Sequence, residues 1–196
     1  MAAIFDINLL CKKIIDFYFI KKILYDYDIN VISVSSIDNW MWDNEQQIRK
    51  MESIEEKVDE SKIIVLKLDS QLFKDAGLYI EKINKEFLYT LWFNTEGYPQ
   101  LDCDTINIEN KIYYEKAYQA ILKLSDEKRD ILKIVGIGIE TDFYYCKNEV
   151  DILQNSKNVV AWILNDNIKE KGVLNKYRQR TIKGTNKIVF ENLTNY

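Results

Sequence analysis

The residues best able to do chemistry in this chain are two closely spaced pairs of carboxylates. Asp102 and Asp104 stand two residues apart, and Glu140 and Asp142 have the same spacing. An Asp-x-Asp pair can hold Mg²⁺ against a phosphate group, because that cation prefers hard oxygen ligands. The same side chains also stabilise turns and helix starts by accepting backbone N–H groups. The second role is the commoner one, so we predict structural carboxylates and no bound metal.

Other catalytic side chains are missing or isolated. The sequence contains no histidine, and its three cysteines, Cys11, Cys103 and Cys146, are far apart. Without imidazole there is no Ser-His or Cys-His nucleophile pair and no common transition-metal ligand. Gly136 and Gly138 precede the second acidic pair, but a dinucleotide cradle needs a further glycine in a turn that opens a helix. We therefore predict no catalytic residue and no cofactor, and we expect these glycines to admit a neighbouring backbone or a bulky side chain.

Aromatic side chains next to acids offer a different chemistry, that of a binding surface. Residues 38–43 read Asp-Asn-Trp-Met-Trp-Asp, ahead of an expected helix. Tryptophan and tyrosine dominate the energetic centres of protein interfaces, and acids steer basic partners toward them. The alternative is that the tryptophans anchor the helix start by packing in the core. The candidate partner-binding residues are Asp38, Trp40, Trp42, Asp43, Glu96, Tyr98, Asp102, Asp104, Tyr114 and Tyr144.

The elements that would position these residues follow from hydrophobic periodicity. Apolar residues at intervals of three and four predict helices, and short runs of β-branched and aromatic residues predict strands. A loop over residues 95–109 holds the first acidic pair, and the chain closes with a β-hairpin around residues 183–186. The predicted helices cover residues 7–27, 43–58, 70–83, 110–124 and 143–154, and the predicted strands cover 31–34, 62–68, 86–94, 131–139, 159–164, 176–182 and 187–190.

This order of elements predicts an α/β or α+β fold, with a mixed β-sheet and helices packed on it. With one proline and six glycines the chain has no obvious linker, so we expect residues 1–196 to form one globular domain. The order helix–strand–helix–strand occurs twice, over residues 40–95 and 110–165, which suggests a tandem αβαβ duplication. Any α/β chain with short connections produces the same order, so both explanations stay open.

Composition limits the partners and the compartment. The net charge of −4 gives no basic surface for phosphate groups, so we expect no nucleic-acid binding. No stretch has the roughly 20 apolar residues of a membrane span, and the N-terminal residues lack the pattern of a secretion signal. Separated cysteines are typical of a reducing compartment. We expect a cytoplasmic protein that does not interact with membranes.

The segment from Leu88 to Tyr118, LYTLWFNTEGYPQLDCDTINIENKIYYEKAY, resembles bacterial immunity proteins, which protect a producing cell from its own secreted toxins. The resemblance is one of type, to small, acidic, aromatic-rich proteins without catalytic motifs. It implies that acids and aromatics cover the cationic or substrate-binding face of a toxin. Two other functions stay open. A metal-dependent enzyme would bring the two acidic pairs into one cleft, and a subunit or scaffold of a larger assembly would expose an extended apolar patch.

Overall fold

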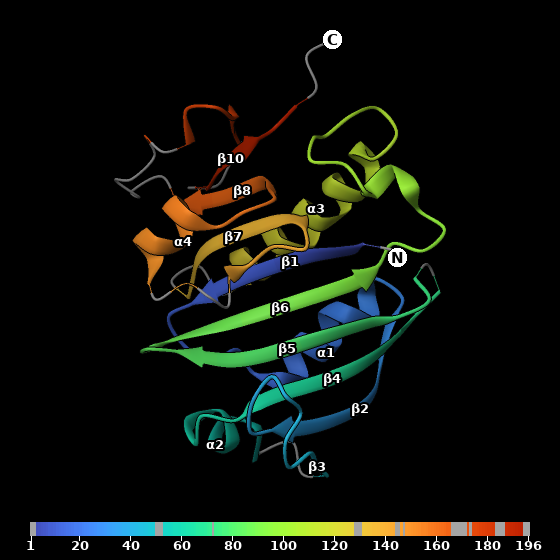
Figure 1. The fold of residues 1–196 in the computed structure, drawn as a ribbon, viewed down its shortest axis with the longest axis vertical. Helices are drawn as coiled ribbons and strands as arrows, with labels where there is room; N and C mark the ends of the chain where they lie inside the picture. Colours follow the sequence, from blue (N-terminus) through green and yellow to red (C-terminus); the bar gives the residue numbers. More distant parts are fainter. Residues whose placement is uncertain are drawn as a thin grey trace.

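The computed structural model describes residues 3–49, 53–71, 73–127, 131–143, 146, 148–165, 172, 174–182 and 187–193. The strands are β1 (Ile4–Cys11), β2 (Ile29–Ile37), β3 (Gln46–Gln47), β4 (Ile63–Ser70), β5 (Ala76–Ile83), β6 (Glu86–Asn94), β7 (Leu132–Ile139), β8 (Val159–Asn165), β9 (Arg178–Thr181) and β10 (Lys187–Glu191). The helices are α1 (Phe17–Asp26), α2 (Ser53–Asp59), α3 (Lys111–Glu127) and α4 (Glu149–Asn155), with a 3₁₀ turn η1 at Pro99–Leu101. Within these residues the strands form one sheet in the order β3-β2-β4-β5-β6-β1-β7-β8-β10-β9 (Figure 1).

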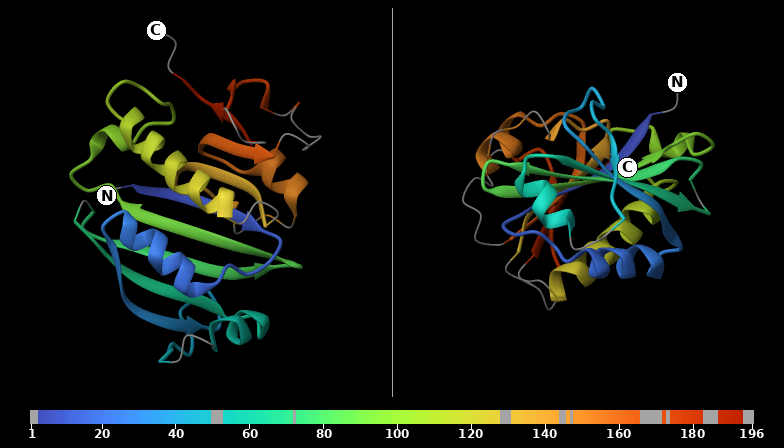
Figure 2. Two further views of the ribbon diagram at one scale, coloured as in Figure 1. Left: turned by 180° about the vertical axis from the view of Figure 1, so that it is seen from behind. Right: turned by 90° about the horizontal axis from the view of Figure 1, so that it is seen from below.

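The two faces of the sheet are covered differently. Helices α1 and α3 lie on one side, which we call the helical face (Figure 2). Helix α4 and the loop of residues 38–45 lie on the other side, which we call the open face because strands β2 to β6 carry no helix there (Figure 2). Among the described residues, no helix has both the length and the apolar character needed to cross a bilayer.

Alternating side chains of each strand supply the two faces. On β1, Phe5, Ile7 and Leu9 belong to a large buried cluster with Leu24 of α1 and Ile121 of α3. Helix α1 begins where Asp16 accepts a hydrogen bond from the backbone N of Phe19, at 3.0 Å. Its apolar stripe then packs on the sheet. Burial of this stripe is the main force that holds α1 there.

A second buried cluster lies on the open face beneath α4. It contains Leu10, Leu88 and Ile134 from three adjacent strands, together with Phe143 and Trp162. The rings of Phe143 and Trp162 are stacked, with centroids 5.5 Å apart and an interplanar angle of 27°. This end of the open face is therefore filled by core packing. At the other end, Ile37, Ile63 and Val65 form a smaller buried cluster, against which Tyr79 packs.

The expected class, helices packed against one sheet, is confirmed. The C-terminal hairpin is also present, because β9 and β10 pair antiparallel. Its expected turn, residues 183–186, lies outside the described residues. The ladders between the described strands run antiparallel, and parallel pairing there is limited to an isolated bridge between Ile106 and Leu193.

Two predicted helices are wrong. The helix expected over residues 7–27 is strand β1 followed by α1, and the helix expected over 70–83 ends in strand β5. Strand β1 is buried on both faces from Phe5 to Cys11. Ile7, Leu10, Ile14 and Phe17 are spaced by three and four, which matches a helix, although Asp6 and Asn8 alternate with apolar residues as in a strand.

Three further expectations change. The described residues between 43 and 58 form a loop, β3 and most of α2 rather than one helix, and α4 is shorter than the helix expected over 143–154. The order α2-β4-β5-β6 in the first segment differs from α3-β7-α4-β8 in the second, so the tandem αβαβ order does not recur. The strands expected over 86–94, 131–139 and 159–164, the loop over 95–109 and the helix over 110–124 are confirmed.

The strand glycines allow close approach, as expected. A Cβ atom on Gly136 would lie 2.3 Å from Cζ of Phe143, and one on Gly138 would lie 2.1 Å from the backbone O of Asn158. Gly136 therefore makes room for a bulky ring, and Gly138 for a neighbouring backbone. The ring of Phe143 is held in place by its stack on Trp162, so it has little freedom to move aside.

We predict that Gly136→Ala lowers the free energy of unfolding by about 1–3 kcal/mol, the usual cost of overpacking a core. Urea unfolding followed by tryptophan fluorescence measures the change. Gly172→Ala is the matched control, because a Cβ there would meet no atom within 4 Å. Equal stability of the two variants would contradict the packing argument.

Candidate functional site

Three aromatic rings lie side by side on the open face. The ring centroids of Trp40 and Tyr79 are 5.0 Å apart with the rings nearly perpendicular, and those of Tyr79 and Trp92 are 6.0 Å apart with the rings inclined by 24°. Gly77 stands opposite Trp92 in the ladder between β5 and β6. A Cβ on Gly77 would lie 2.6 Å from the indole, so the indole covers this glycine and rests on β5. We call Trp40, Tyr79 and Trp92 the aromatic row.

A buried polar network adjoins one end of the aromatic row. Asp6 of β1 stands opposite Trp92 and is only 6% exposed. Its Oδ2 accepts hydrogen bonds from the backbone N of Thr141 at 2.8 Å and from the hydroxyl at 3.3 Å. The network continues through Asn8, whose Nδ2 donates to Thr141 Oγ1 at 2.6 Å and whose Oδ1 accepts from Thr90 Oγ1 at 2.8 Å.

The carboxyl groups near the two ends of the row bind protons unusually tightly. Burial raises the pKa of Asp6 to about 7, against the opposing effect of the Thr141 hydrogen bonds, and the negative charge of Glu140 adds to the rise. Burial also raises the pKa of Glu81 to about 7, and Trp40 beside it opposes the rise. Both groups are therefore close to half-protonated at neutral pH. A cation brought close would favour the ionised form of each.

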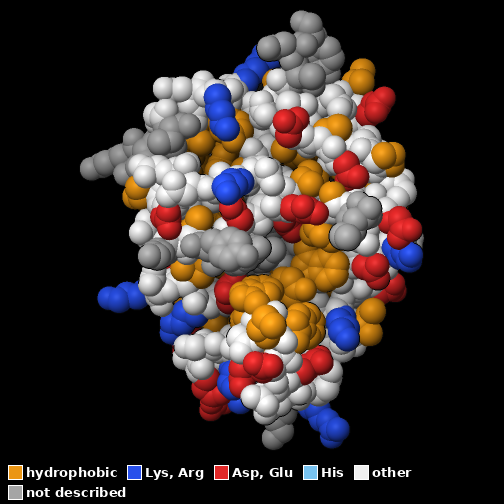
Figure 3. All heavy atoms as spheres, in the orientation of Figure 1, with side chains coloured by type: hydrophobic (Ala, Val, Ile, Leu, Met, Phe, Trp, Pro, Cys, Tyr) orange, Lys and Arg blue, Asp and Glu red, His pale blue; other side chains and the backbone are white. Residues whose placement is uncertain are grey.

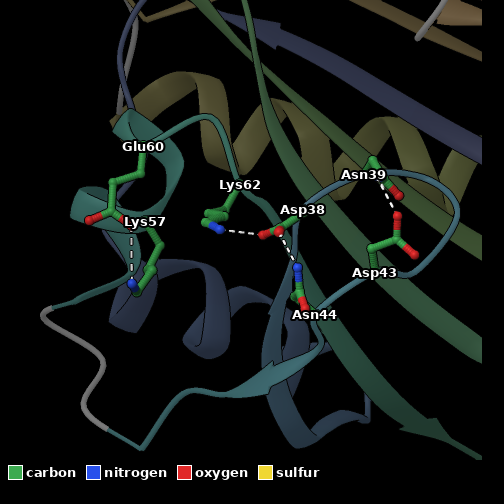
Figure 4. A network of polar contacts seen from close by, with 7 residues as sticks. All are labelled: Asp38, Asn39, Asp43, Asn44, Lys57, Glu60 and Lys62. Carbon is green, nitrogen blue, oxygen red and sulfur yellow. Dashed lines mark hydrogen bonds and ion pairs between the residues drawn. The ribbon is translucent and has the colours of Figure 1, made fainter.

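Trp40 lies in a loop that several hydrogen bonds and an ion pair hold in place. Asp38 donates its backbone N–H to the carbonyl of Asp43 at 3.0 Å, and Asn39 Nδ2 donates to the Asp43 carboxylate at 2.9 Å. Asn44 Nδ2 donates to Asp38 Oδ2 at 2.7 Å, and Lys62 forms an ion pair with the same carboxylate (Figure 4). These contacts fix the loop of residues 38–45 to the start of β4.

The tip of this loop is both exposed and strained. Trp40 is 39%, Met41 82% and Trp42 42% exposed. Trp42 has φ of +63°, a left-handed conformation that costs a bulky residue about 1–2 kcal/mol. The hydrogen bond from Trp42 N to the carbonyl of Asn39, at 3.0 Å, helps to maintain it. The tryptophans therefore do not anchor a helix, since α2 begins only at Ser53.

The surface of the open face combines these features. Figure 3 shows an apolar patch in the lower half of the molecule, with acidic side chains on several sides of it. The loop of residues 38–45 crosses in front of β4 and β5 in the same orientation (Figure 1). An apolar centre with a charged rim is the usual anatomy of a protein interface.

Four of the predicted site residues, Asp38, Trp40, Trp42 and Asp43, are brought together in this loop. Tyr98 lies elsewhere, against Phe73 and Tyr113, with ring centroids 5.0 and 5.8 Å away. Glu96 forms an ion pair with Lys74 at 3.0 Å. Tyr144 lies outside the described residues.

Tyr114 was expected at a partner surface, and this expectation is wrong. Its side chain is fully buried and meets Phe5 edge-on, with centroids 5.5 Å apart. Successive helix positions point about 100° apart, so Tyr113 and Tyr114 face different surroundings, and Tyr114 is the one that faces the sheet. Tyr114 is therefore part of the core between α3 and the sheet.

The two acidic pairs hold separate pieces of chain. Asp102 Oδ1 accepts from Thr95 Oγ1 at 2.6 Å, and the carbonyl of Asp104 accepts from Asn192 Nδ2 at 2.8 Å. Asp142 Oδ1 accepts from the backbone N of Lys157 at 2.7 Å. Among the described residues no three or more acids or cysteines come together as metal ligands.

The helical face holds a different kind of hollow, an apolar cavity of about 90 Å³ between α1 and α3. Ile20 and Leu24 line one side, and Ala117 and Ile121 line the other. Tyr89 also lines it, but its hydroxyl already accepts a hydrogen bond from Ile15 N at 2.7 Å. The cavity therefore offers apolar contact and no group that could orient or react with a ligand.

The sequence did not identify Asp6, Tyr79, Glu81 and Trp92 as site residues. The first three lie on β1 and β5, and the spacing of apolar residues in these segments had predicted helices. A local signal for β5 was nevertheless present, because two kinds of residue alternate along it, as in a strand with two different faces. The apolar set is Ala76, Leu78 and Ile80, and the set between them is Gly77, Tyr79 and Glu81.

The raised pKa of Asp6 predicts a pH-dependent stability. In the unfolded chain this carboxyl ionises near pH 3.8, but in the fold it keeps its proton up to about pH 7. Its contribution to stability is therefore fully present below pH 3.8 and is lost as the pH rises to about 7. We expect Asp6→Asn to gain stability over the parent chain across this range, by at most about 1.4 kcal/mol per pH unit.

Urea unfolding between pH 2 and 8 measures this difference. Asp26→Asn is the control of opposite sign, because the hydrogen bond from Lys123 lowers the pKa of Asp26. The Asp26 carboxylate stabilises the fold above its unfolded pKa, and this contribution is lost on acidification. The free energy of unfolding of the parent chain should therefore rise relative to that of Asp26→Asn as the pH rises. Parallel stability curves for Asp6→Asn and the parent chain would contradict the burial of a titrating carboxyl.

Comparisons with known proteins do not connect the chain to a family. No family model matches it, and no match was found among curated proteins or solved structures. The function therefore has to be argued from the residues of the chain itself.

Proposed function

We propose that the protein is a binding module that neutralises a basic protein partner by covering it, as bacterial immunity proteins cover their toxins. The observation that carries this proposal is the loop of residues 38–45. It holds Met41 and Trp42 at the surface next to Trp40, which belongs to the aromatic row. Large apolar side chains of this kind supply most of the binding energy in protein interfaces.

The rigidity of the loop favours binding. Ordering a flexible loop would cost about 0.5–1.5 kcal/mol for each long side chain that is immobilised. Here the hydrogen bonds of Asn39 and Asn44 and the ion pair between Lys62 and Asp38 already fix the loop. The partner therefore meets a surface that needs little rearrangement, which supports tight association.

The charge around the loop indicates a basic partner. Asp6 and Glu81 lie on the open face, and Glu140 lies next to Asp6. Asp43 and Glu45 stand in the loop itself, and Glu45 accepts a hydrogen bond from Ser35 Oγ at 2.9 Å. The chain as a whole carries −4. Complementary charge speeds encounter and disfavours acidic partners.

Occlusion is the mechanism that these features support. A stable complex of this type buries about 1,600 Å² in total, so the loop and the aromatic row would form its centre rather than all of it. We place the protein in the cytoplasm of the producing cell. The three cysteines, all of them described, are free thiols, which suits a reducing compartment.

The paired substitution Met41→Ala and Trp42→Ala tests the proposal. We expect at least a 100-fold loss of affinity for the partner, because two exposed apolar anchors are removed. The folded state should be unchanged, since both side chains project from the surface. Tyr25→Ala is the matched control, because Tyr25 is 69% exposed on α1, on the helical face.

The measurement begins with affinity capture from the producing cell and mass spectrometry of the captured protein. That protein should be toxic when produced alone and harmless when produced with the parent chain or with Tyr25→Ala. Protection should be lost with the paired variant. A captured protein that is not toxic, or one that binds the paired variant as tightly as the parent chain, would refute the proposal.

A further inference from the structure

We propose that the aromatic row receives arginine side chains of the partner, which stack on its rings and pair with the carboxyl group of Glu81, while the buried Asp6 adds negative charge beneath the surface. This inference rests on the proposed function and names the chemistry that the open face recognises. It concerns the sheet surface beside the loop, whereas the loop tip supplies apolar contact.

The arrangement of Trp92 provides a platform for a planar group. One side of its indole rests on Gly77, where a Cβ would approach to 2.6 Å, and the residue as a whole is only half-buried. Tyr79 continues the surface, inclined by 24° to the indole. Guanidinium groups are planar and weakly hydrated, so they stack on aromatic faces. Such contacts are stronger for arginine than for the compact, strongly hydrated ammonium group of lysine.

The carboxyl groups lie where stacked guanidinium groups need counter-charges. Asp6 is the direct cross-strand neighbour of Trp92, and Glu81 is two residues beyond Tyr79 on β5, beside Trp40. Oε1 of Glu81 is buried and meets no hydrogen-bond donor within the part of the chain that the structure describes. An acceptor left in this state costs about 1–3 kcal/mol. Glu81 as a whole is partly exposed, so a rotation of its side chain brings this oxygen to the surface, where the five N–H donors of arginine can satisfy it.

Lys67 supplies an internal comparison of charge. It stands opposite Gly77 in the ladder between β4 and β5, and so in the same cross-strand row as Trp92 and Asp6. A positive charge at this position repels a cationic ligand and attracts an anionic one. Removal of the Lys67 charge should therefore strengthen the binding of a cationic ligand and weaken that of an anionic one. Removal of the Glu81 charge should weaken the binding of a cationic ligand and strengthen that of an anionic one.

The test is a titration of the full chain with the peptide acetyl-Arg-Gly-Arg-amide, followed by NMR signals of the tryptophan indole N–H groups. The matched probe replaces both arginines with citrulline, which keeps the shape and removes the charge. We expect saturable shifts of the Trp92 and Trp40 signals, with the citrulline peptide binding at least ten-fold more weakly. Glu81→Gln should weaken binding of the arginine peptide at least five-fold, and Lys67→Gln should strengthen it.

Gly77→Ala provides a second route to the same answer. The added methyl group displaces the Trp92 indole, so this variant should lose the arginine-dependent shift of Trp92 even if its stability changes little. Equal binding of both peptides, no saturable shift, or weaker binding by Lys67→Gln would each overturn the inference. If the inference fails but partner capture still depends on Met41 and Trp42, the proposed function is supported. If partner binding does not depend on Met41 and Trp42, the proposed function is refuted even if the peptide binds.

Discussion

The central position of β1 is the constraint on which the rest of the structure depends. This strand pairs with β6 on one side and with β7 on the other, so it joins the two halves of a ten-stranded sheet built from the described residues. One row of its side chains, including Phe5 and Ile7, packs beneath α1 and α3. The other row places Asp6 and Asn8 on the open face, where they can be buried only because Thr141 and Thr90 satisfy them. A substitution in β1 therefore affects the core and the candidate site together.

The loop of residues 38–45 and the open face each hold side chains in an unfavourable state. The loop holds Trp42 in a left-handed conformation that its own hydrogen bonds maintain. The sheet holds two carboxyl groups, Asp6 and Glu81, in surroundings that favour the neutral form. Each feature lowers the stability of the isolated fold. Local strain and perturbed ionisation of this kind are concentrated at functional sites in general.

The sequence predicted the parts of the fold that carry a local signal. The strands β6, β7 and β8 were placed within a few residues, because their aromatic and β-branched runs are bounded by clear breaks. Strand β1 was missed because Ile7, Leu10 and Ile14 also match helical intervals and continue into α1. Strand β5 was missed because Ala76, Ile80 and Ile83 also match helical intervals. The loop of residues 38–43 was found since its residues are neighbours in sequence. The aromatic row was not, because the register between β1, β5 and β6 assembles it and no local pattern encodes register.

The pairing of β1 with distant strands has a consequence for the newly made protein. Asp6 is translated long before its neighbours Trp92 and Gly138, which lie opposite it on β6 and β7. At typical rates of synthesis the delay between β1 and β7 is on the order of ten seconds. During that time the nascent chain on the ribosome lacks the acidic network, because Thr141 follows β7. A half-made polypeptide therefore lacks the candidate site, which is complete only when most of the chain has left the exit tunnel.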